Sequence, residues 1–446
     1  MHRYIPNSEQ DKKDMLKAID KQSIGDLFTD IPEKFRLDRD LNLDPSKSEL
    51  EVDRLLKSLA AKNANLDHLT CFMGAGAYDH FIPTIVNHLA GRSEFYTAYT
   101  PYQPEISQGT LQNIFEYQSL ICELTGVDVS NASVYDGSHA AAEAAIMACA
   151  AKKRDKMLIS NTVHPETRQV LKTYFKFRGM ELVEVPMKAG ETDYEALKDL
   201  ADKSVAGVLI QSPNFFGVIE DVQKTSEIMK ESKGLTVVSV DPISLAVLEP
   251  PGNLGADIVI GEGQALGNDL ALGGPYFGFM AVTKKLMRKV PGRICGQSLD
   301  EDGKRAFVLT LQAREQHIRR EKATSNICTN QGLMILKAAI YMNTVGKEGL
   351  KDVALHSMKK AHYLHKKLIE SGVAEPVFDK PFFKEFAVKL KNPVALVNEE
   401  LLKKGILGGF DINSHYPMSN TMLIAVTEKR TREELDDFVK ALEVIK

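Results

Sequence analysis

Several features that would restrict the function are missing from this 446-residue chain. Its 56 lysines and arginines nearly balance its 60 aspartates and glutamates, and no basic stripe indicates a nucleic-acid or membrane partner. The longest mostly apolar run, residues 270–282, is interrupted by glycines and a proline and is too short to span a bilayer. The N-terminus leads directly into a charged helix, so we expect no signal peptide. These absences favour a cytoplasmic protein with neither nucleic acid nor membrane as a partner.

Cysteines are also few, and their spacing excludes two further classes of site. The five are scattered along the chain, odd in number and without a C-x-x-C pair: Cys71, Cys122, Cys149, Cys295 and Cys328. This pattern is typical of buried thiols in a reducing cytosol, not of a zinc site or a disulfide framework. We predict no metal site.

Residues 1–68 are expected to form a helical arm. Ser8 can cap one helix, and Ser48-x-x-Glu51 is a capping box that opens a second. Each helix carries one apolar stripe, which cannot close a core alone. The arm therefore has to pack on something else.

The rest of the chain divides into two expected domains. Within residues 69–325, short runs rich in valine, isoleucine and leucine alternate with helical stretches, which predicts a large α/β domain with a mostly parallel sheet buried on both faces. The expected strands are residues 156–160, 181–186, 205–211, 236–240 and 257–260. Residues 326–446 are expected to form a smaller C-terminal α+β domain with helices at 331–343 and 353–370, a strand at 420–427 and a last helix capped by Thr431.

A lysine is missing where the surrounding pattern asks for one. The strand at 236–240 ends in Asp241, and a second strand and a glycine-rich turn follow. This order suits a pyridoxal phosphate (PLP) pocket, in which an aspartate pairs with the pyridinium nitrogen and a lysine forms a Schiff base. Here the lysine position reads Gln264 or Ala265, and the next lysines, Lys284 and Lys285, lie beyond the turn. Either the PLP interpretation is wrong or the chain is one half of a two-chain enzyme.

Other residues after strand ends could belong to the same pocket, and each has a plainer alternative. Ser138 and His139 open an alanine-rich helix whose N-terminus could bind phosphate, or Ser138 could only cap that helix. His164 could stack on a pyridine ring or be a hydrogen-bonded loop histidine. Asn214 could face a substrate or form a strand-to-loop turn, and Asp241 could cap a turn.

A tyrosine-rich segment follows the glycine-rich residues 73–80. Its polar and aromatic residues are Tyr96, Tyr99, Tyr102, Gln103 and Glu105. Ordered tyrosines beside glycines and prolines suit an interface or a small-ligand wall. The alternative is that they are core aromatics of an irregular segment.

Three arginines near residues 290–320 could contact an anion. Arg293, Arg314 and Arg319 precede a run of small residues at 323–326, and arginine binds carboxylates and phosphates bidentately. The alternative is a solvated helix face.

Together these segments resemble the P-protein (glycine decarboxylase) family of the glycine cleavage system, specifically the first subunit of its two-chain form. The most specific matches are residues 73–78, 96–112, 136–145, 292–298 and 312–326. The resemblance covers nearly the whole chain. It implies an α/β fold of the PLP-dependent transferase fold type I, and an assembly with two copies of each subunit.

The resemblance also implies an activity and its partners. The family is an oxidoreductase of glycine catabolism that decarboxylates glycine and transfers the aminomethyl group to the oxidised lipoamide of H-protein. The second subunit would hold PLP on a His-Lys pair that matches Gln264-Ala265. This chain would hold no catalytic residue of its own, would keep a vestigial cofactor pocket at Ser138, His139, His164, Asn214, Asp241 and Gln264, and would line the partner's site with its tyrosine-rich segment.

Two other functions remain open at this point. The chain could be an autonomous fold-type-I PLP enzyme whose lysine is Lys284 or Lys322. It could also be a non-catalytic scaffold subunit that kept the fold and lost the activity.

Overall fold

The computed structural model describes residues 4–445, which form two units that divide between Ala64 and Asn65. The N-terminal unit holds α1 (Glu9–Ala18), η1 (Ile24–Phe28), η2 (Glu33–Phe35) and α2 (Glu49–Ala60). The expected cap at Ser8 and the expected capping box at Ser48 are formed, because both serines accept the backbone N–H of the third helical residue. None of the described residues of this unit is buried, so the unit does not form a core of its own. The expected boundaries at 68 and 325 stay predictions.

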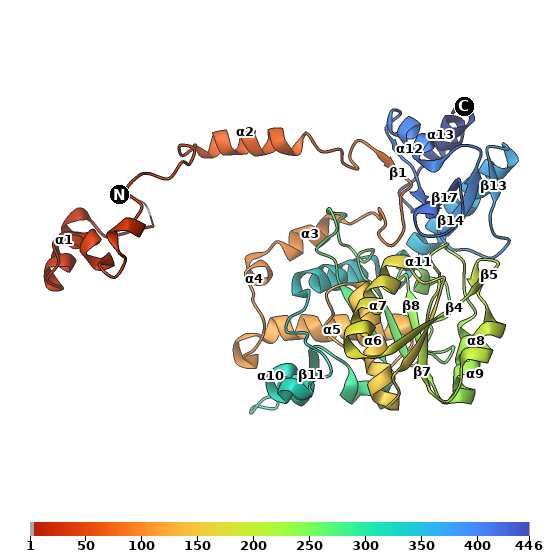
Figure 1. The fold of residues 1–446 in the computed structure, drawn as a ribbon, viewed down its shortest axis with the longest axis horizontal. Helices are drawn as coiled ribbons and strands as arrows, with labels where there is room; N and C mark the ends of the chain where they lie inside the picture. Colours follow the sequence, from red (N-terminus) through yellow and green to blue (C-terminus); the bar gives the residue numbers. More distant parts are fainter. Residues whose placement is uncertain (1–3, 446) are drawn as a thin grey trace. The chain divides into compact units, whose positions relative to one another are not determined.

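A seven-stranded sheet forms the centre of the second unit (Figure 1). Its order is β2 (Val129–Ser130), β10 (Gly278–Val282), β9 (Ile258–Glu262), β8 (Leu235–Val240), β7 (Val205–Gln211), β3 (Lys156–Ser160) and β4 (Glu181–Val185). The ladders from β9 to β4 are all parallel, whereas β10 pairs antiparallel with both β9 and β2. The five strands expected from the apolar runs are all present.

Alternating side chains place the two faces of this sheet in different cores. Along β3, Leu158 belongs to one core, whereas Met157 and Ile159 belong to the other. The alanine-rich helix α6 (Gly137–Lys152) and α7 (Pro165–Arg178) cover the second face. The first face is covered by α5 (Gln108–Thr125), α8 (Tyr194–Leu200) and α9 (Val222–Ser232). Burial on both faces explains the continuous apolar strands.

The C-terminal part adds a second, antiparallel sheet in the order β13 (Ala374–Pro376), β14 (Glu385–Leu390), β17 (Thr421–Ala425) and β16 (Phe410–Asp411). α12 (Val394–Leu402) and α13 (Arg432–Glu443), the latter capped by Thr431, pack with it in one core. The two helices expected before it are both present and meet directly within α11 (Gly332–Glu370), at a non-helical Gly346 with φ of 63°. A positive φ suits glycine, so the chain continues with a kink instead of a loop.

Shorter elements connect these parts. They are β1 (Thr70–Cys71), α3 (Thr84–Ala90), α4 (Ser93–Tyr96), η3 (Pro104–Ile106), β5 (Met187–Lys188), β6 (Glu191–Thr192), η4 (Ser244–Ala246), η5 (Lys284–Lys289), β11 (Ile294–Leu299), β12 (Arg305–Thr310), η6 (Gln312–Arg314), α10 (Gln316–Arg319), η7 (Arg320–Lys322), β15 (Ile406–Leu407) and η8 (Ile412–Ser414).

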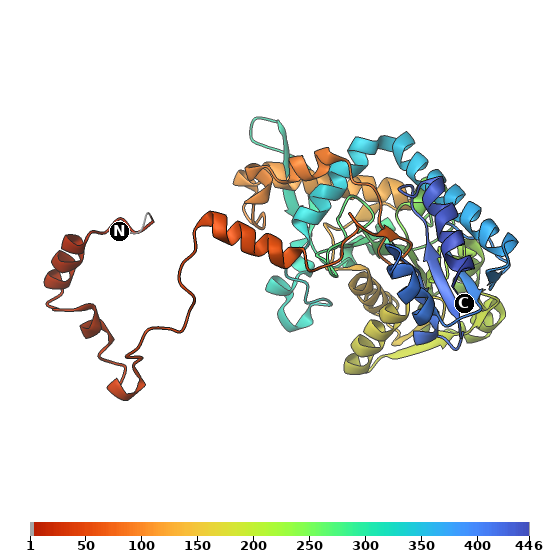
Figure 2. The same cartoon turned by 90° about the horizontal axis from the view of Figure 1, so that it is seen from above.

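The smaller sheet packs against one end of the large one (Figures 1 and 2). Phe215 and Phe216, in the loop after β7, share a core with Leu423 of β17. At Gly217, φ is 81° and a Cβ would collide with the backbone carbonyl of Glu385. This close approach brings the start of β14 to the carboxyl ends of β7, β8 and β9, where ligands bind in parallel sheets.

Candidate functional site

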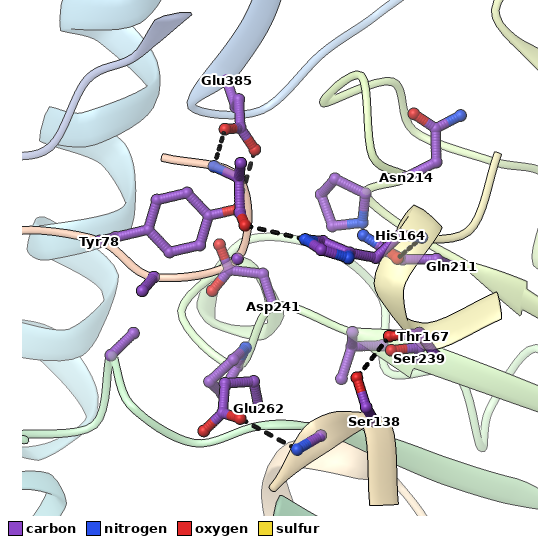
Figure 3. A pocket seen from close by; sticks show the side chains of 18 of the residues that line it. Tyr78, Ser138, His164, Thr167, Gln211, Asn214, Ser239, Asp241, Glu262 and Glu385 are labelled. Carbon is purple, nitrogen blue, oxygen red and sulfur yellow. Dashed lines mark hydrogen bonds between the residues drawn. The ribbon is translucent and has the colours of Figure 1, made fainter. Parts of the chain in front are cut away.

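A cavity of about 350 Å³ lies at the carboxyl ends of β7, β8 and β9. Four of the predicted pocket residues line it: Ser138, His164, Asn214 and Asp241. Figure 3 shows Asp241 between Tyr78 and Glu262, with Ser138 and Thr167 facing each other beneath His164. The parallel sheet therefore brings these residues from different strands to one pocket, as the strand-end rule predicts.

Both carboxylate oxygens of Asp241 already have partners within the chain. Oδ1 accepts the backbone N–H of Ile243 at 3.0 Å, which is the turn-capping role. Oδ2 forms an ion pair with the Nζ of Lys384 at 2.7 Å. Asp241 therefore has the turn-capping role that the sequence left open and is also paired with a lysine, whereas its place in a vestigial cofactor pocket stays a prediction.

Lys384, one residue before β14, is held on several sides. Its side chain is 1% exposed, its ammonium donates to Nε2 of His80 at 2.8 Å, and it lies 3.7 Å above the ring centroid of Tyr78. His80 Nδ1 in turn contacts Glu428 at 2.6 Å. Burial and the neighbouring Lys384 lower the pKa of His80, so a neutral imidazole accepts from the lysine. A buried ammonium with this many partners is a structural cation.

Glu385, a buried acid at the start of β14, holds the glycine-rich residues 73–80 at the pocket. It accepts the backbone N–H of Ala75 at 2.6 Å and the hydroxyl of Tyr78 at 2.8 Å. Burial raises the pKa of Glu385 to about 7. The carbonyl of Ala75 accepts from Nε2 of His164 at 2.9 Å.

His164 is a hydrogen-bonded loop histidine. It caps α7, because its Nδ1 accepts the N–H of Glu166 at 3.2 Å, and its ring meets Phe215 edge-on at 5.1 Å. Burial lowers its pKa. Both ring nitrogens are engaged, as expected of a hydrogen-bonded loop histidine, and because His164 also lines the cavity its place in a vestigial cofactor pocket stays a prediction.

The N-terminus of α6 is also occupied. Asp136, not Ser138, caps the helix by accepting the N–H of His139 at 2.7 Å. The Gly137 N–H donates to Oε2 of Glu262 at 2.9 Å, and the Ser138 hydroxyl bonds the Thr167 hydroxyl at 2.8 Å. Burial raises the pKa of Glu262 to about 7. The Gly137 N–H and the Ser138 hydroxyl, two of the groups expected to bind phosphate at this helix end, thus contact the chain's own side chains.

The remaining predicted pocket residues hold loops together. His139 contacts the Tyr174 hydroxyl at 2.7 Å and does not line the cavity. Buried Asn214 organises its own turn by donating to the Gly190 carbonyl at 2.8 Å and accepting the N–H groups of Phe216 and Val218.

The two residues that could match the lysine position, Gln264 and Ala265, have different surroundings. Gln264 is buried and joins the glycine-rich segment through both backbone groups of Tyr78, at 2.9 and 3.2 Å. Ala265 lines the cavity, and neither Lys284 nor Lys322 does. The position at which a Schiff-base lysine would face the pocket is therefore Ala265, and it carries only a methyl group.

The residues of the pocket do not fit PLP. Among the residues that the structure describes, its lining includes one lysine and no arginine, against five acidic residues: Asp136, Glu166, Asp241, Glu262 and Glu385. A phosphate dianion would meet carboxyl groups where a cofactor pocket presents donors. Within residues 4–445, no group of three or more histidine, cysteine or acidic residues could hold a metal ion.

The tyrosine-rich segment lies at a different cavity, of about 210 Å³. Tyr96 and Tyr99 line it, whereas Tyr102, Gln103 and Glu105 are exposed beside it. The exposed fractions of Tyr96, Tyr99 and Tyr102 are 67%, 86% and 61%. Aromatics this exposed are not core residues, which removes the plainer alternative.

The three arginines divide between two places. Arg314 and Arg319 line a cavity of about 180 Å³. Arg314 donates to the carbonyl of Gly292 at 2.8 Å, and its Nη1 is buried without a partner among the described residues. Arg293 is buried and donates to the carbonyl of Cys328 at 2.7 Å, which fastens that segment. Anion binding by these residues stays a prediction.

Sequence reasoning missed Lys384, Glu385 and Glu262. The first two lie in the run Lys380-Pro381-Phe382-Phe383-Lys384-Glu385, which gives no sign that its charges are buried. Glu262 follows the expected strand at Asp257–Ile260. Its position could have predicted a pocket residue, because an acid at a strand end of a parallel sheet faces the edge where ligands bind.

Comparisons with known proteins agree along the whole chain. Residues 2–442 match the family profile described as "Glycine cleavage system P-protein". The "Probable glycine dehydrogenase (decarboxylating) subunit 1" of Carboxydothermus hydrogenoformans is 56% identical over 441 residues, covering 99% of each chain. The protein of the same name from Anoxybacillus flavithermus is 54% identical over 443 residues, again covering 99% of each.

Solved structures show the same relationship. A crystal structure described as "glycine decarboxylase (P-protein) of the glycine cleavage system, in inhibitor-bound form" is 41% identical, covers 100% of both chains and superposes with a TM-score of 0.92. A "NIFS-LIKE PROTEIN" at 17% identity and a TM-score of 0.62 shares the fold alone. The expected fold type I of PLP-dependent enzymes is confirmed. No helix within residues 4–445 has the length and apolar character needed to cross a membrane. The chain belongs to the glycine cleavage system P-protein family.

Proposed function

We propose that this chain is subunit 1 of a two-chain glycine dehydrogenase (decarboxylating) and that it completes the active site of a second, PLP-holding subunit. The observation that carries the proposal is the pocket itself. Ala265 occupies the lysine position, and Asp241 is paired with Lys384 at 2.7 Å. A chain that keeps the fold over its full length but cannot hold the cofactor needs a partner that can.

The proposed reaction is glycine decarboxylation with transfer of the aminomethyl group to the lipoyl arm of H-protein. The names of the relatives, "subunit 1" of glycine dehydrogenase, support the existence of a second subunit. We propose an assembly with two copies of each subunit, cytoplasmic, with glycine and lipoylated H-protein as substrates. No catalytic residue is assigned to this chain alone.

The contact with the partner's site is assigned to the tyrosine-rich segment. Tyr99 and Tyr102 expose most of their surface on a loop without secondary structure. Large aromatic side chains are common at the centres of interfaces, because they bury much area at little entropic cost. Tyr96, Gln103 and Glu105 flank them and complete the proposed lining.

The test is an exchange assay with this chain and its second subunit from the same organism, each alone and together. Glycine-dependent CO2 exchange in the presence of H-protein is expected only from the mixture. Activity of the chain alone would support an autonomous enzyme, and activity of the second subunit equal to that of the mixture would support a scaffold. Either result overturns the proposal.

Alanine variants test the assigned surface. Tyr99→Ala and Tyr102→Ala are expected to lower turnover of the mixture by about tenfold or more, which corresponds to about 1.4 kcal/mol, while leaving the stability of the chain within about 0.5 kcal/mol. Phe177→Ala is the matched control, because this aromatic at the end of α7 is 80% exposed outside the segment. Unchanged turnover in both tyrosine variants would remove the segment from the shared site.

A further inference from the structure

In the pocket of this chain, two of its own side chains contact the groups that PLP would need, Asp241 and the N-terminus of α6. We propose that Lys384 and Glu262 are built-in occupants, the Lys384 ammonium in place of a pyridinium on Asp241 and the Glu262 carboxyl in place of a phosphate at the N-terminus of α6. The pocket then rejects PLP for reasons that are independent of the missing lysine. This inference rests on the proposed function in taking the pocket as vestigial.

The first step concerns the position of the Lys384 ammonium. The ring nitrogen of PLP and the ring carbon that carries its aldehyde lie at opposite ends of the pyridine. A PLP whose nitrogen paired with Asp241 would therefore point its aldehyde away from a lysine that also contacts Asp241, at 2.7 Å. Lys384 is a competitor for the ring position and not a displaced Schiff-base lysine.

The second step concerns whether Lys384 can move aside. Its ammonium is held by His80 at 2.8 Å and by the face of Tyr78 at 3.7 Å, and His80 is itself held by Glu428 at 2.6 Å. Withdrawing the ammonium would leave Oδ2 of Asp241 and Nε2 of His80 without a donor in a buried site. Breaking a buried pair by removing one partner is strongly unfavourable, so the cation is a permanent part of the pocket.

The third step concerns the phosphate position. The Gly137 N–H that opens α6 donates to Glu262 at 2.9 Å, and a Cβ at Gly137 would lie 3.0 Å from the backbone N of Glu262. The hydroxyls of Ser138 and Thr167 share one hydrogen bond at 2.8 Å. A phosphate would have to displace Glu262 without finding an arginine in the lining. The Gly137 N–H, which would donate to the phosphate, is therefore already bound to a carboxyl group of the same chain.

The experiment restores the lysine and then removes the occupants one at a time. The variants are A265K, A265K/E262Q, A265K/K384M and A265K/E262Q/K384M, with A265K/E262Q/K384R as the matched control that keeps the cation. Each chain is co-purified with its second subunit, incubated with PLP and reduced with borohydride. Peptide mass spectrometry then measures PLP attached at position 265, so that PLP on the partner is not counted.

We expect no label in the pocket of wild type and only weak labelling at position 265 in A265K and in the control A265K/E262Q/K384R. The triple variant is expected to be labelled at position 265 at least about tenfold more than A265K, since each tenfold corresponds to about 1.4 kcal/mol of binding free energy. Labelling of A265K equal to that of the triple variant would overturn the proposal. A folded triple variant that stays unlabelled would overturn it as well.

One measurement needs no variant. In wild type treated with PLP and borohydride, Lys384 is expected to stay unlabelled while exposed lysines react, and a label on Lys384 would overturn the proposal even if K384M failed to fold. The labelling results are independent of the exchange assay. Loss of the proposed function would appear as no gain of exchange in the mixture. Loss of this inference would appear as a label on Lys384 of wild type, as equal labelling of A265K and A265K/E262Q/K384M, or as a folded A265K/E262Q/K384M chain without label.

Discussion

The buried pair of Lys384 and Asp241 makes a prediction about stability that a functioning cofactor aspartate would not make. Lys384→Met has a similar length and volume but removes the ammonium. In wild type the Lys384 ammonium lies 2.7 Å from Asp241 Oδ2 and 2.8 Å from His80 Nε2, and the variant leaves both atoms without this hydrogen-bond donor. Removing one partner of a buried pair costs about 3–5 kcal/mol, and we expect Lys384→Met to lower the free energy of unfolding by that amount.

The double variant Asp241→Asn/Lys384→Met should cost less than Lys384→Met alone. The asparagine removes the uncompensated charge and keeps an acceptor for the Ile243 N–H, which Asp241 binds at 3.0 Å. Replacing a whole buried pair by neutral groups is often close to neutral. The interaction free energy from this cycle should therefore exceed about 1 kcal/mol, within the range seen for contacting residues.

The assay is urea unfolding of wild type, both single variants and the double variant, followed by far-ultraviolet circular dichroism. Lys337→Met is the control, because Lys337 also contacts an aspartate, Asp269, at 2.9 Å, but that aspartate is 54% exposed. Exposed pairs contribute about 1 kcal/mol or less. Equal costs for Lys384→Met and Lys337→Met, or additive costs in the cycle, would refute the reasoning.

Two further predictions concern the contacts of Glu385. Burial raises the pKa of Glu385 to about 7, above the value of about 4.3 in an unfolded chain. The folded state therefore binds the proton more tightly than the unfolded state. As a result, the free energy of unfolding falls as pH rises from about 5 to 7. Glu385→Gln should reduce this fall by up to about 1.4 kcal/mol per pH unit, measured by urea unfolding between pH 5 and pH 8, and an unchanged slope would contradict it. Gly217→Ala should cost about 3 kcal/mol by the same assay, because φ is 81° and the new Cβ meets the Glu385 carbonyl. In the control Gly179→Ala, φ is 66° but space is open, so only the backbone strain of about 1–2 kcal/mol applies; equal costs would count against the collision.

The layout of the site was predictable because strand ends in a parallel sheet share one edge. The apolar runs at 205–211 and 236–240 predicted β7 and β8, and Asp241 directly follows the second run. Knowing that these strands are parallel was enough to bring Asp241 and Asn214 to one pocket. The absence of a lysine at Gln264-Ala265 was also visible, since it needs no knowledge of side-chain orientation.

The partners of those residues could not be predicted, because they depend on how the second sheet packs. Lys384 reaches Asp241 only because Gly217 allows the start of β14 to approach the loop after β7. The local sequence around Lys384 is that of an ordinary charged edge, and no periodicity distinguishes a buried lysine there from a solvated one. The same limit applies to Asp136, whose capping of α6 removes the alternative in which Ser138 only caps that helix.

A lysine in a pocket of this fold is therefore not by itself a sign of PLP chemistry. A lysine can form a Schiff base only if its amine lies at the aldehyde end of the PLP ring. The amine of Lys384 instead lies at Asp241, where the ring nitrogen would be. The loss of a lysine at Ala265 removes the covalent anchor, but noncovalent binding would survive that change if Asp241 and the N-terminus of α6 were free. Their occupation by Lys384 and Glu262 removes the noncovalent contacts as well. Two separate features of this chain, the alanine at position 265 and the contacts of Lys384 and Glu262, thus both act against PLP binding. A search for the anchoring lysine alone would detect only the first.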